Sequence, residues 1–446
     1  MSSPSTARRR LLSASAWLLL ISGCSHAPGP DVAHAAEDWT DTKVNVAGRP
    51  VIGSGVVAVT GVRPAGMLET AVDDAATGRR LWTGPATMAG RLPGMGVQPP
   101  AIAGTSVVAL EPRTDGQWKA MLVARDAKTG KQVWARGVDS TFGPVACGEN
   151  VCLSESTASR NPRFVVLEGD TGRVLWRLRG LAEVEHADRD RVVVFRMAKR
   201  PVLAALSADA GRPLWSFPVE DAVGSGVDLS GGWSFGSAGD LLLGSIAPAR
   251  RGGSLSAYGF FALRLSDGSP VWAHPRQLRI YPSPNPAVGL VTREVGASGG
   301  YRGFTRIDAR TGRRLASVPA SAVPSGSSWW LSFSSDLTSL GFWVPDQPGS
   351  AFEFRGAGAV PLKELRAWSF CTTSPKPLRL AGGASGFFPV APLCAYELST
   401  GRRVSDSGPP PIWYTGSSDG VRAWRDEHGA LHGIRDTTGT APGMYG

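Results

Sequence analysis

Cysteine is the residue type whose spacing in this chain points most directly to chemistry. The sequence holds five cysteines, and two of them, Cys147 and Cys152, flank a Gly-Glu-Asn turn between two short apolar runs. Facing positions of a tight β-hairpin lie within the Cα separation that a disulfide needs. We therefore predict a cross-strand Cys147–Cys152 bridge. Zinc binding and redox chemistry are poorer alternatives, because neither a second ligand pair at zinc spacing nor a Cys-x-x-Cys pair accompanies these residues.

Another cysteine, Cys24, ends an N-terminal segment that has the features of an export signal. Three arginines at positions 8–10 precede an apolar run over residues 11–21, which is too short to cross a membrane as a mature helix. The run leads into Ile21-Ser22-Gly23-Cys24. This order resembles a bacterial lipobox, in which the cysteine thiol becomes a thioether to diacylglycerol. We expect a signal peptide over residues 1–23 and lipidation of Cys24.

Export has further consequences for the rest of the chain. The segment after Cys24 is rich in Ala, His, Pro and acidic residues, so we expect a flexible tether over residues 24–43. The anchored protein would lie on the outer face of the cell membrane, or on an outer membrane if one is present. Two alternatives stay open: cleavage near residues 33–36 with loss of Cys24, and export by the twin-arginine rather than the Sec route. The last two cysteines, Cys371 and Cys394, are assigned to a second disulfide by elimination.

Acid–base or metal chemistry has one candidate cluster, in which His428 and His432 stand beside Asp426 and Glu427. On a strand, residues four apart lie about 13 Å from each other, too far to share a metal ion unless Gly429 makes a turn. The sequence contains no Gly-x-Ser-x-Gly nucleophile elbow and no Walker loop. We therefore predict no catalytic residue, no metal site and no cofactor.

Composition narrows the class of protein. The chain has 446 residues, of which 42% are hydrophobic and 19% charged, with 56 Gly and 34 Pro. This mixture can supply a core, and it argues against long charged helices, coiled coils and intrinsic disorder. The net charge is +10, but no Lys/Arg block typical of nucleic-acid binding occurs outside the export signal. We expect no nucleic-acid partner, and the oligomeric state is not predicted.

The strands and turns that must position the cysteine and histidine side chains form a repeat. Seven segments follow the pattern Asp-Ala-x-Thr-Gly-x-x-Leu/Val-Trp with some departures, and most come after a short apolar run rich in β-branched residues. Such runs indicate strands, and the acidic residue and the Gly indicate a hairpin turn. The turn glycines are Gly78, Gly130, Gly172, Gly211, Gly268, Gly312 and Gly401. In five copies a tryptophan follows four residues later, namely Trp82, Trp134, Trp176, Trp215 and Trp272, and we expect these to be buried between repeat units.

The repeat length predicts a β-propeller. Successive turn glycines lie at distances that suit four-stranded antiparallel blades of ~40–50 residues, and the last gap, from Gly312 to Gly401, is nearly two units long. A degenerate blade fits into that gap around residues 330–354. Because a ring of blades leaves two open edges, we expect the head strand at residues 44–46 to join tail strands over residues 412–434. The prediction is an all-β, eight-bladed β-propeller, with seven or nine blades as alternatives.

The repeated motif resembles that of the propellers named after pyrroloquinoline quinone (PQQ), over about residues 44–435 and with a tail at residues 436–446. One branch of this family consists of quinone-dependent dehydrogenases, which carry a disulfide between adjacent cysteines, whereas this chain has no Cys-Cys pair. The other consists of envelope lipoproteins without catalysis, such as the propeller subunit of the outer-membrane barrel-assembly machinery. The resemblance implies the second: an anchored binding or scaffold propeller that is not an enzyme and has envelope proteins as partners. A quinone-dependent oxidoreductase or a small-ligand sensor is the alternative.

Overall fold

The computed structural model describes residues 38–89, 97–113, 119–156, 162–282, 290–295, 301–323, 330–333, 338–344, 347–363, 366–370, 393–404, 416–418, 420–426 and 428–435. The chain divides after Ala35, and the second unit is Ala36–Gly446. All described residues belong to the second unit. The predicted signal peptide, Cys24, Cys371 and the C-terminal tail lie outside the described residues.

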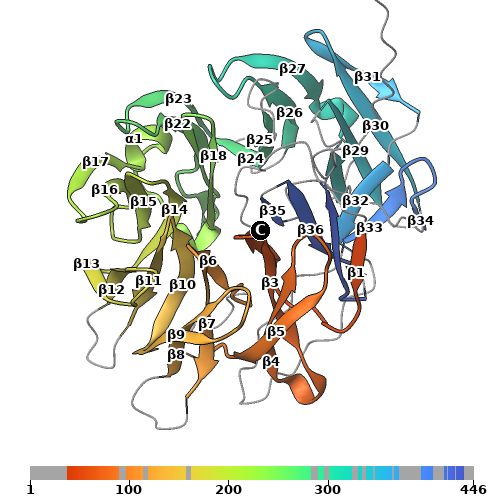
Figure 1. Ribbon diagram of the computed structural model, residues 1–446. Coiled ribbons are helices and arrows are strands. Elements are labelled where there is room, and N and C mark those ends of the chain that lie inside the picture. The colour runs from red at the N-terminus through yellow and green to blue at the C-terminus, as the bar shows by residue number, and fades with distance from the viewer. Residues whose placement is uncertain are drawn as a thin grey trace, which may run out of the picture. The chain divides into compact units, whose positions relative to one another are not determined.

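Antiparallel sheets of four strands dominate the described structure (Figure 1). Sheet 1 holds β2 (Val51–Gly53), β3 (Val56–Val62), β4 (Leu68–Asp74) and β5 (Arg80–Ala86), and sheet 2 holds β6 (Ala101–Ala103), β7 (Ser106–Pro112), β8 (Ala120–Asp126) and β9 (Gln132–Val138). Sheet 3 holds β10 (Ser140–Cys147), β11 (Asn150–Glu155), β12 (Arg163–Leu167) and β13 (Val174–Arg179), and sheet 4 holds β14 (Ala182–Ala187), β15 (Arg191–Arg196), β16 (Val202–Ser207) and β17 (Pro213–Pro218). Sheet 5 holds β18 (Trp233–Ala238), β19 (Leu241–Ile246), β22 (Gly259–Arg264) and β23 (Pro270–Pro275).

The second half of the described chain continues the pattern. Sheet 6 holds β24 (Gln277–Pro282), β25 (Leu290–Val295), β26 (Tyr301–Ile307) and β27 (Arg314–Pro319), and sheet 7 holds β28 (Trp330–Phe333), β29 (Ser339–Val344), β30 (Gln347–Arg355) and β31 (Gly358–Leu362). Sheet 8 has three strands, β32 (Arg366–Phe370), β33 (Leu393–Glu397) and β34 (Arg402–Val404). Sheet 9 joins β35 (Gly416–Ser418), β36 (Val421–Arg425) and β37 (Leu431–Arg435) to β1 (Trp39–Asp41). The remaining elements are a small hairpin of β20 (Arg250–Arg251) and β21 (Ser254–Leu255), the helix α1 (Glu220–Val223), and 3-10 turns at Pro64–Gly66, Leu229–Gly231 and Ala320–Ala322.

This architecture is an all-β propeller of four-stranded antiparallel sheets, as the repeat predicted. The described residues form nine sheets of three or four strands, so the expected count of eight blades is not confirmed. One of the nine is sheet 7, which fills the long gap between the last two turn glycines where a degenerate blade was expected. No helix in the described part of the chain is long and apolar enough to cross a membrane.

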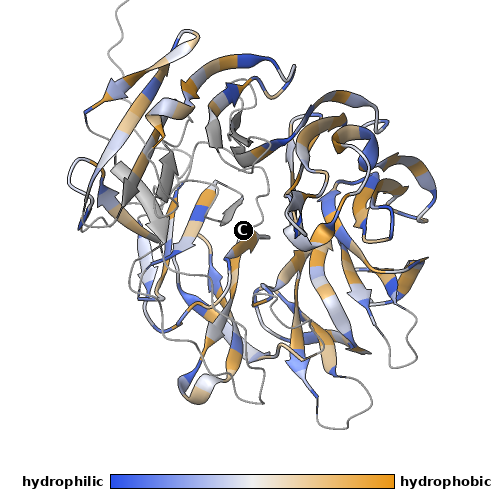
Figure 2. Ribbon diagram, turned by 180° about the vertical axis from the view of Figure 1, so that it is seen from behind, coloured by the Kyte–Doolittle hydropathy of each residue, from blue (hydrophilic) through white to orange (hydrophobic). Residues whose placement is uncertain are grey.

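Successive sheets pack on each other in chain order. The first strand of each sheet contacts the first strand of the next from β2 through β6, β10 and β14 to β18, and β35 of sheet 9 contacts β2 of sheet 1. Central strands are therefore covered on both faces, which explains why β3 and β19 are buried along their whole length and read as continuous apolar runs. Hydrophobic residues concentrate in the strands and hydrophilic ones in many of the turns (Figure 2).

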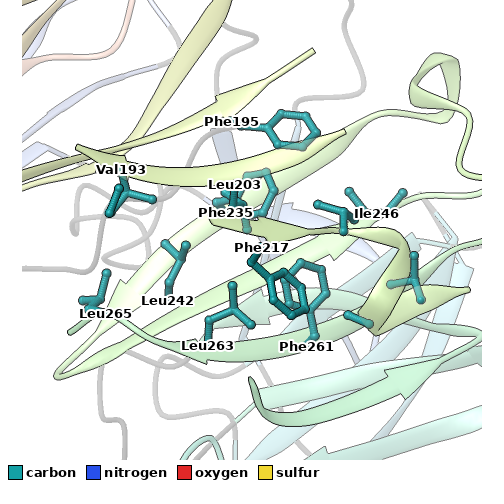
Figure 3. Packing of buried hydrophobic residues seen from close by; sticks show 14 residues of the cluster. Val193, Phe195, Leu203, Phe217, Phe235, Leu242, Ile246, Phe261, Leu263 and Leu265 are labelled. Carbon is teal, nitrogen blue, oxygen red and sulfur yellow. The ribbon is translucent and has the colours of Figure 1, made fainter. Parts of the chain in front are cut away.

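A large apolar cluster fills the space between sheets 4 and 5 (Figure 3). Phe195 of β15 and Phe235 of β18 have ring centroids 5.0 Å apart, and Phe217 of β17 lies 6.1 Å from Phe261 of β22. Aromatic residues bury more area than other side chains, so such contacts stabilise the packing of one sheet on the next. The core thus lies between sheets, where the propeller prediction places it.

The head and tail of the chain share sheet 9, as the closure argument predicted, but the pairing residues differ from the expected ones. Strand β1 pairs with β37 through Trp39–Gly433, Thr40–His432 and Asp41–Leu431. Val46, expected in the head strand, instead forms an isolated bridge with Gly61 of sheet 1. Val44 and Val46 are buried beside this closure, and the backbone N–H of Val46 donates to the carbonyl of Gly429 at 2.8 Å, while the ring of Trp39 covers Gly78 and Gly433.

Candidate functional site

Five of the repeat turns are built from an acidic residue, a threonine and a glycine, whereas the turns at Gly211 and Gly268 lack the threonine. Between β8 and β9, Asp126 Oδ1 accepts hydrogen bonds from the backbone N–H of Thr129 at 2.8 Å and from its hydroxyl at 2.7 Å. Hydrogen bonding by Thr129 lowers the pKa of Asp126. Gly130 has a φ of 70°, in the left-handed region that favours glycine, and the other six turn glycines have φ values of 65–70°. The motif acid therefore serves the turn.

The motif tryptophans dock each sheet onto the next repeat turn. Trp134 is 8% exposed, and its indole N–H donates to the carbonyl oxygen of Gly169 at 2.6 Å. Its ring covers Gly172 so closely that a Cβ on this glycine would lie 2.6 Å from the ring. Both contacts recur in the other copies: Trp82 with Ala127 and Gly130, Trp176 with Ala208 and Gly211, Trp215 with Leu265 and Gly268, and Trp272 with Ala309 and Gly312. The tryptophans are thus used to hold sheets together.

Sequence reasoning missed one member of this series. Trp39 of β1 donates its indole N–H to the carbonyl of Ala75 at 3.0 Å, and its ring covers Gly78. It is therefore the docking tryptophan of the first repeat, supplied by the closing sheet. A signal for it was available, because Gly78 is the first turn glycine and no earlier repeat provides a tryptophan. In the copies that lack tryptophan, the position holds Ala316, which is buried, and Ser405, which lies outside the described residues.

The predicted cysteine bridges are placed as follows. Cys147 and Cys152 are joined by a disulfide between β10 and β11, with their Cα atoms 5.9 Å apart. The two residues are diagonal neighbours, because Cys147 pairs with Asn150 and Cys152 with Val145 in the strand register. Cys394 of β33 is also disulfide-bonded, and its expected partner, Cys371, lies outside the described residues, as does Cys24.

The described residues of the histidine cluster, Asp426, His428 and His432, lie at and beside a turn. Gly429 has a φ of 90°, and Asp426 Oδ1 accepts the backbone N–H groups of His428 and Ala430 at 2.8 and 2.9 Å. Within the residues that the structure describes, no group of three or more His, Cys, Asp or Glu side chains is placed to hold a metal ion. Glu427 lies outside that part. The turn that was required for a shared metal therefore exists, but it is stabilised by Asp426 itself.

The imidazole of His432, in β37 just after this turn, links the two ends of the described chain. His432 Nε2 lies 2.9 Å from Asp426 Oδ2, and its Nδ1 lies 2.9 Å from the hydroxyl of Thr40. Since a carboxylate only accepts hydrogen bonds, Nε2 donates to Asp426 and Nδ1 accepts from Thr40. Trp424 stacks on the ring with centroids 5.3 Å apart. The hydroxyl–imidazole–carboxylate order is that of nucleophilic catalysis, but here Thr40 and His432 are cross-strand neighbours of β1 and β37, and Asp426 lies in the turn before β37.

Electrostatics around this imidazole keep the carboxylate ionised. Burial alone would raise the pKa of Asp426, but the hydrogen bonds from His432 and from the backbone N–H groups of Ala430 and His428 bring it below its usual range. The ionised carboxylate is thus available as an acceptor for His432 at neutral pH.

Asp41, the third residue of β1, forms an ionic cluster with two residues of sheet 1. Arg80 of β5 donates from Nε to Asp73 of β4 and from Nη2 to Asp41 of β1, so that one guanidinium serves two carboxylates. Asp73 is 0% and Asp41 7% exposed. The three consecutive residues Trp39, Thr40 and Asp41 thus make three separate attachments, which we call the closing joint.

A small polar cavity lies between sheets 1 and 2. It is lined by Thr60, Thr70, Thr87 and Gln98 among others, and leaves about 10 Å³ for the centre of a water molecule. The Thr70 hydroxyl is buried without a hydrogen-bond partner. This volume suits one water molecule and is far too small for a quinone.

Solved structures resemble the chain at low sequence identity. BamB from Moraxella catarrhalis matches with 12% identity and a TM-score of 0.41, covering 90% of this chain and 98% of that one. The quinohemoprotein alcohol dehydrogenase ADHIIG from Pseudomonas putida HK5 matches with 12% identity and a TM-score of 0.39, covering 90% and 76%. The quinohemoprotein alcohol dehydrogenase from Comamonas testosteroni has 14% identity, a TM-score of 0.32 and coverage of 91% and 68%. Likeness at this level does not transfer a function.

The sequence also matches a known family directly. No curated protein matches the chain significantly. A family model described as outer membrane protein assembly factor BamB matches residues 33–156 and 119–327, which include the first six repeat turns with their glycines. Together with the PQQ-like repeat and the propeller of antiparallel sheets, this match shows that the chain belongs to the outer membrane protein assembly factor BamB family.

Proposed function

We propose that this chain is an exported, lipid-anchored envelope protein whose propeller is a non-catalytic scaffold for other envelope proteins. The observation that carries the proposal is the family match, because the description of that family concerns the assembly of outer membrane proteins. The roles of the motif side chains support the proposal. The motif acids accept hydrogen bonds within the turns, and the motif tryptophans pack one sheet against the next. The lipobox-like sequence before Cys24 supports the anchor.

The anchor is tested by Cys24→Ser. This change removes the thiol that would carry diacylglycerol, so we expect the protein to leave the membrane fraction or to remain unprocessed, and to lose its cross-links to envelope proteins in intact cells. The measurements are cell fractionation, fatty-acid labelling and cross-linking followed by mass spectrometry. Ser25→Ala is the matched control, because it changes the adjacent residue and leaves the lipobox-like sequence intact. A wild-type protein that is soluble and carries no fatty-acid label would contradict the anchor.

The non-catalytic part of the proposal is tested with the cofactor of the dehydrogenase branch. Purified protein mixed with PQQ and calcium is expected to show no protein-bound quinone absorbance and no oxidation of alcohols or sugars. The reason is the position of the disulfide. Cys147 and Cys152 are five residues apart and join the two strands of a hairpin, whereas the dehydrogenases of the family carry a disulfide between two adjacent cysteines. A quinone dehydrogenase assayed in parallel is the positive control. Stoichiometric quinone binding with alcohol oxidation would overturn the scaffold proposal and favour the oxidoreductase.

A further inference from the structure

The closing joint contains a charge imbalance in a buried place. Arg80 carries one positive charge, and Asp41 and Asp73 on either side of it carry two negative charges when both are ionised. Oδ2 of Asp73 is buried and has no hydrogen-bond partner. An uncompensated charge in a low-dielectric site is costly, whereas a neutral carboxyl group could donate a hydrogen bond there. The geometry therefore favours a bound proton between the two carboxyl groups.

We propose that the closing joint binds a proton on mild acidification, and that this proton strengthens the attachment of β1 to sheet 1. The proton goes to Asp73, which then donates toward the neighbouring carboxylate of Asp41, while Arg80 keeps one ionised partner. The cluster of Arg80, Asp41 and Asp73 becomes electrically neutral in this state. The closure of the propeller is thus tighter at pH 5 than at pH 7.5. This inference concerns the fold itself and does not depend on the proposed anchor or scaffold role.

The titration of Asp73 has the direction that the geometry requires. Burial raises the pKa of Asp73 from 3.8 to about 6, the hydrogen bond and charge of Arg80 oppose the rise, and the charge of Asp41 adds to it. Because the folded value lies above the unfolded one, the folded protein binds the proton more tightly. The stabilisation is fully present below about pH 4 and is lost as the pH rises through about 6.

The other charged groups at the joint do not cancel this effect. Arg80 stays charged throughout this pH range. The backbone N–H of Lys43 donates to Asp41 Oδ1 at 2.7 Å whatever the pH. His432, on the strand next to β1, contacts Thr40 and Asp426. Asp73 is therefore the group whose titration changes the joint.

The test is hydrogen exchange of the β1 amides at pH 5 and pH 7.5, corrected for the pH dependence of intrinsic exchange. In the wild type, protection of β1 is expected to be about tenfold higher at pH 5, because the pKa of Asp73 lies about one unit above that pH. Asp73→Asn mimics the neutral carboxyl, so its β1 protection should be the same at both pH values. Asp41→Asn, which removes the nearby negative charge but leaves Asp73 buried, should reduce the rise without abolishing it.

The control is Glu155→Gln. Glu155 is another fully buried carboxylate that contacts two arginines, Arg136 and Arg163, but it lies in sheet 3 away from β1. This variant is expected to keep the tenfold rise. Equal protection of wild-type β1 at the two pH values, or an undiminished rise in both Asp73→Asn and Asp41→Asn, would overturn the proposal.

Discussion

Replacing Trp134 by alanine is expected to lower the free energy of unfolding by about 3–5 kcal/mol. The side chain is 8% exposed and lies in the apolar cluster between sheets 2 and 3, so its loss leaves a large cavity. The change also leaves the carbonyl of Gly169 without the indole N–H that now binds it at 2.6 Å. The measurement is the equilibrium urea unfolding curve of the purified protein.

A neighbour on the same strand provides the matched control. Val133 precedes Trp134 in β9 and is 49% exposed, so Val133→Ala removes apolar atoms from the same strand without making a buried cavity. Surface changes of this kind usually stay within about 0.5 kcal/mol. A cost for Trp134→Ala as small as that of Val133→Ala would contradict the docking role of the motif tryptophans.

The spacing of residues in the sequence predicted the repeat turns well, because residues within one hairpin determine the conformation of each turn. An acidic residue, a threonine and a glycine at fixed distances determine the hydrogen bonds of the turn and its left-handed residue, as Asp126, Thr129 and Gly130 show. The sequence also predicted burial for every tryptophan four residues after the glycine, of which Trp134 and Trp176 are buried and Trp82, Trp215 and Trp272 are only partly buried. The position of these tryptophans recurs in the sequence, and recurrence at a fixed offset indicates a recurring place in the packing.

The closing joint was beyond such reasoning because it joins residues far apart in the chain. Asp41, Asp73 and Arg80 belong to three strands of two sheets, and none of them stands out in the sequence. The closing strand was displaced by a few residues for a related reason. The alternating segment Val44-Asn45-Val46 reads locally as a strand, whereas the contacts of Trp39 with Gly78 and Gly433 form only in the folded protein.

Replacing Gly172 by alanine is expected to cost about 2–4 kcal/mol, as the sum of two separate effects. The residue has a φ of 68°, and a Cβ in this conformation costs about 1 kcal/mol or more. The new Cβ would also lie 2.6 Å from the ring of Trp134, and relieving that overlap costs about 1–3 kcal/mol. Gly239→Ala separates the two effects, since Gly239 has a φ of 62° and a Cβ there would meet nothing within 4 Å. It should show the backbone cost alone.

The Gly172 and Trp134 changes together measure the docking contact itself. In a protein that already carries Trp134→Ala, the ring that blocks the new Cβ is gone, so Gly172→Ala should cost no more than Gly239→Ala does. The two changes are therefore expected to be non-additive, with the double variant more stable than the sum of the single ones by about 1–3 kcal/mol. Urea unfolding of the four proteins of this cycle gives the coupling. Additive costs would mean that the ring of Trp134 and the turn at Gly172 do not meet in solution, and that the sheets are held together by other contacts.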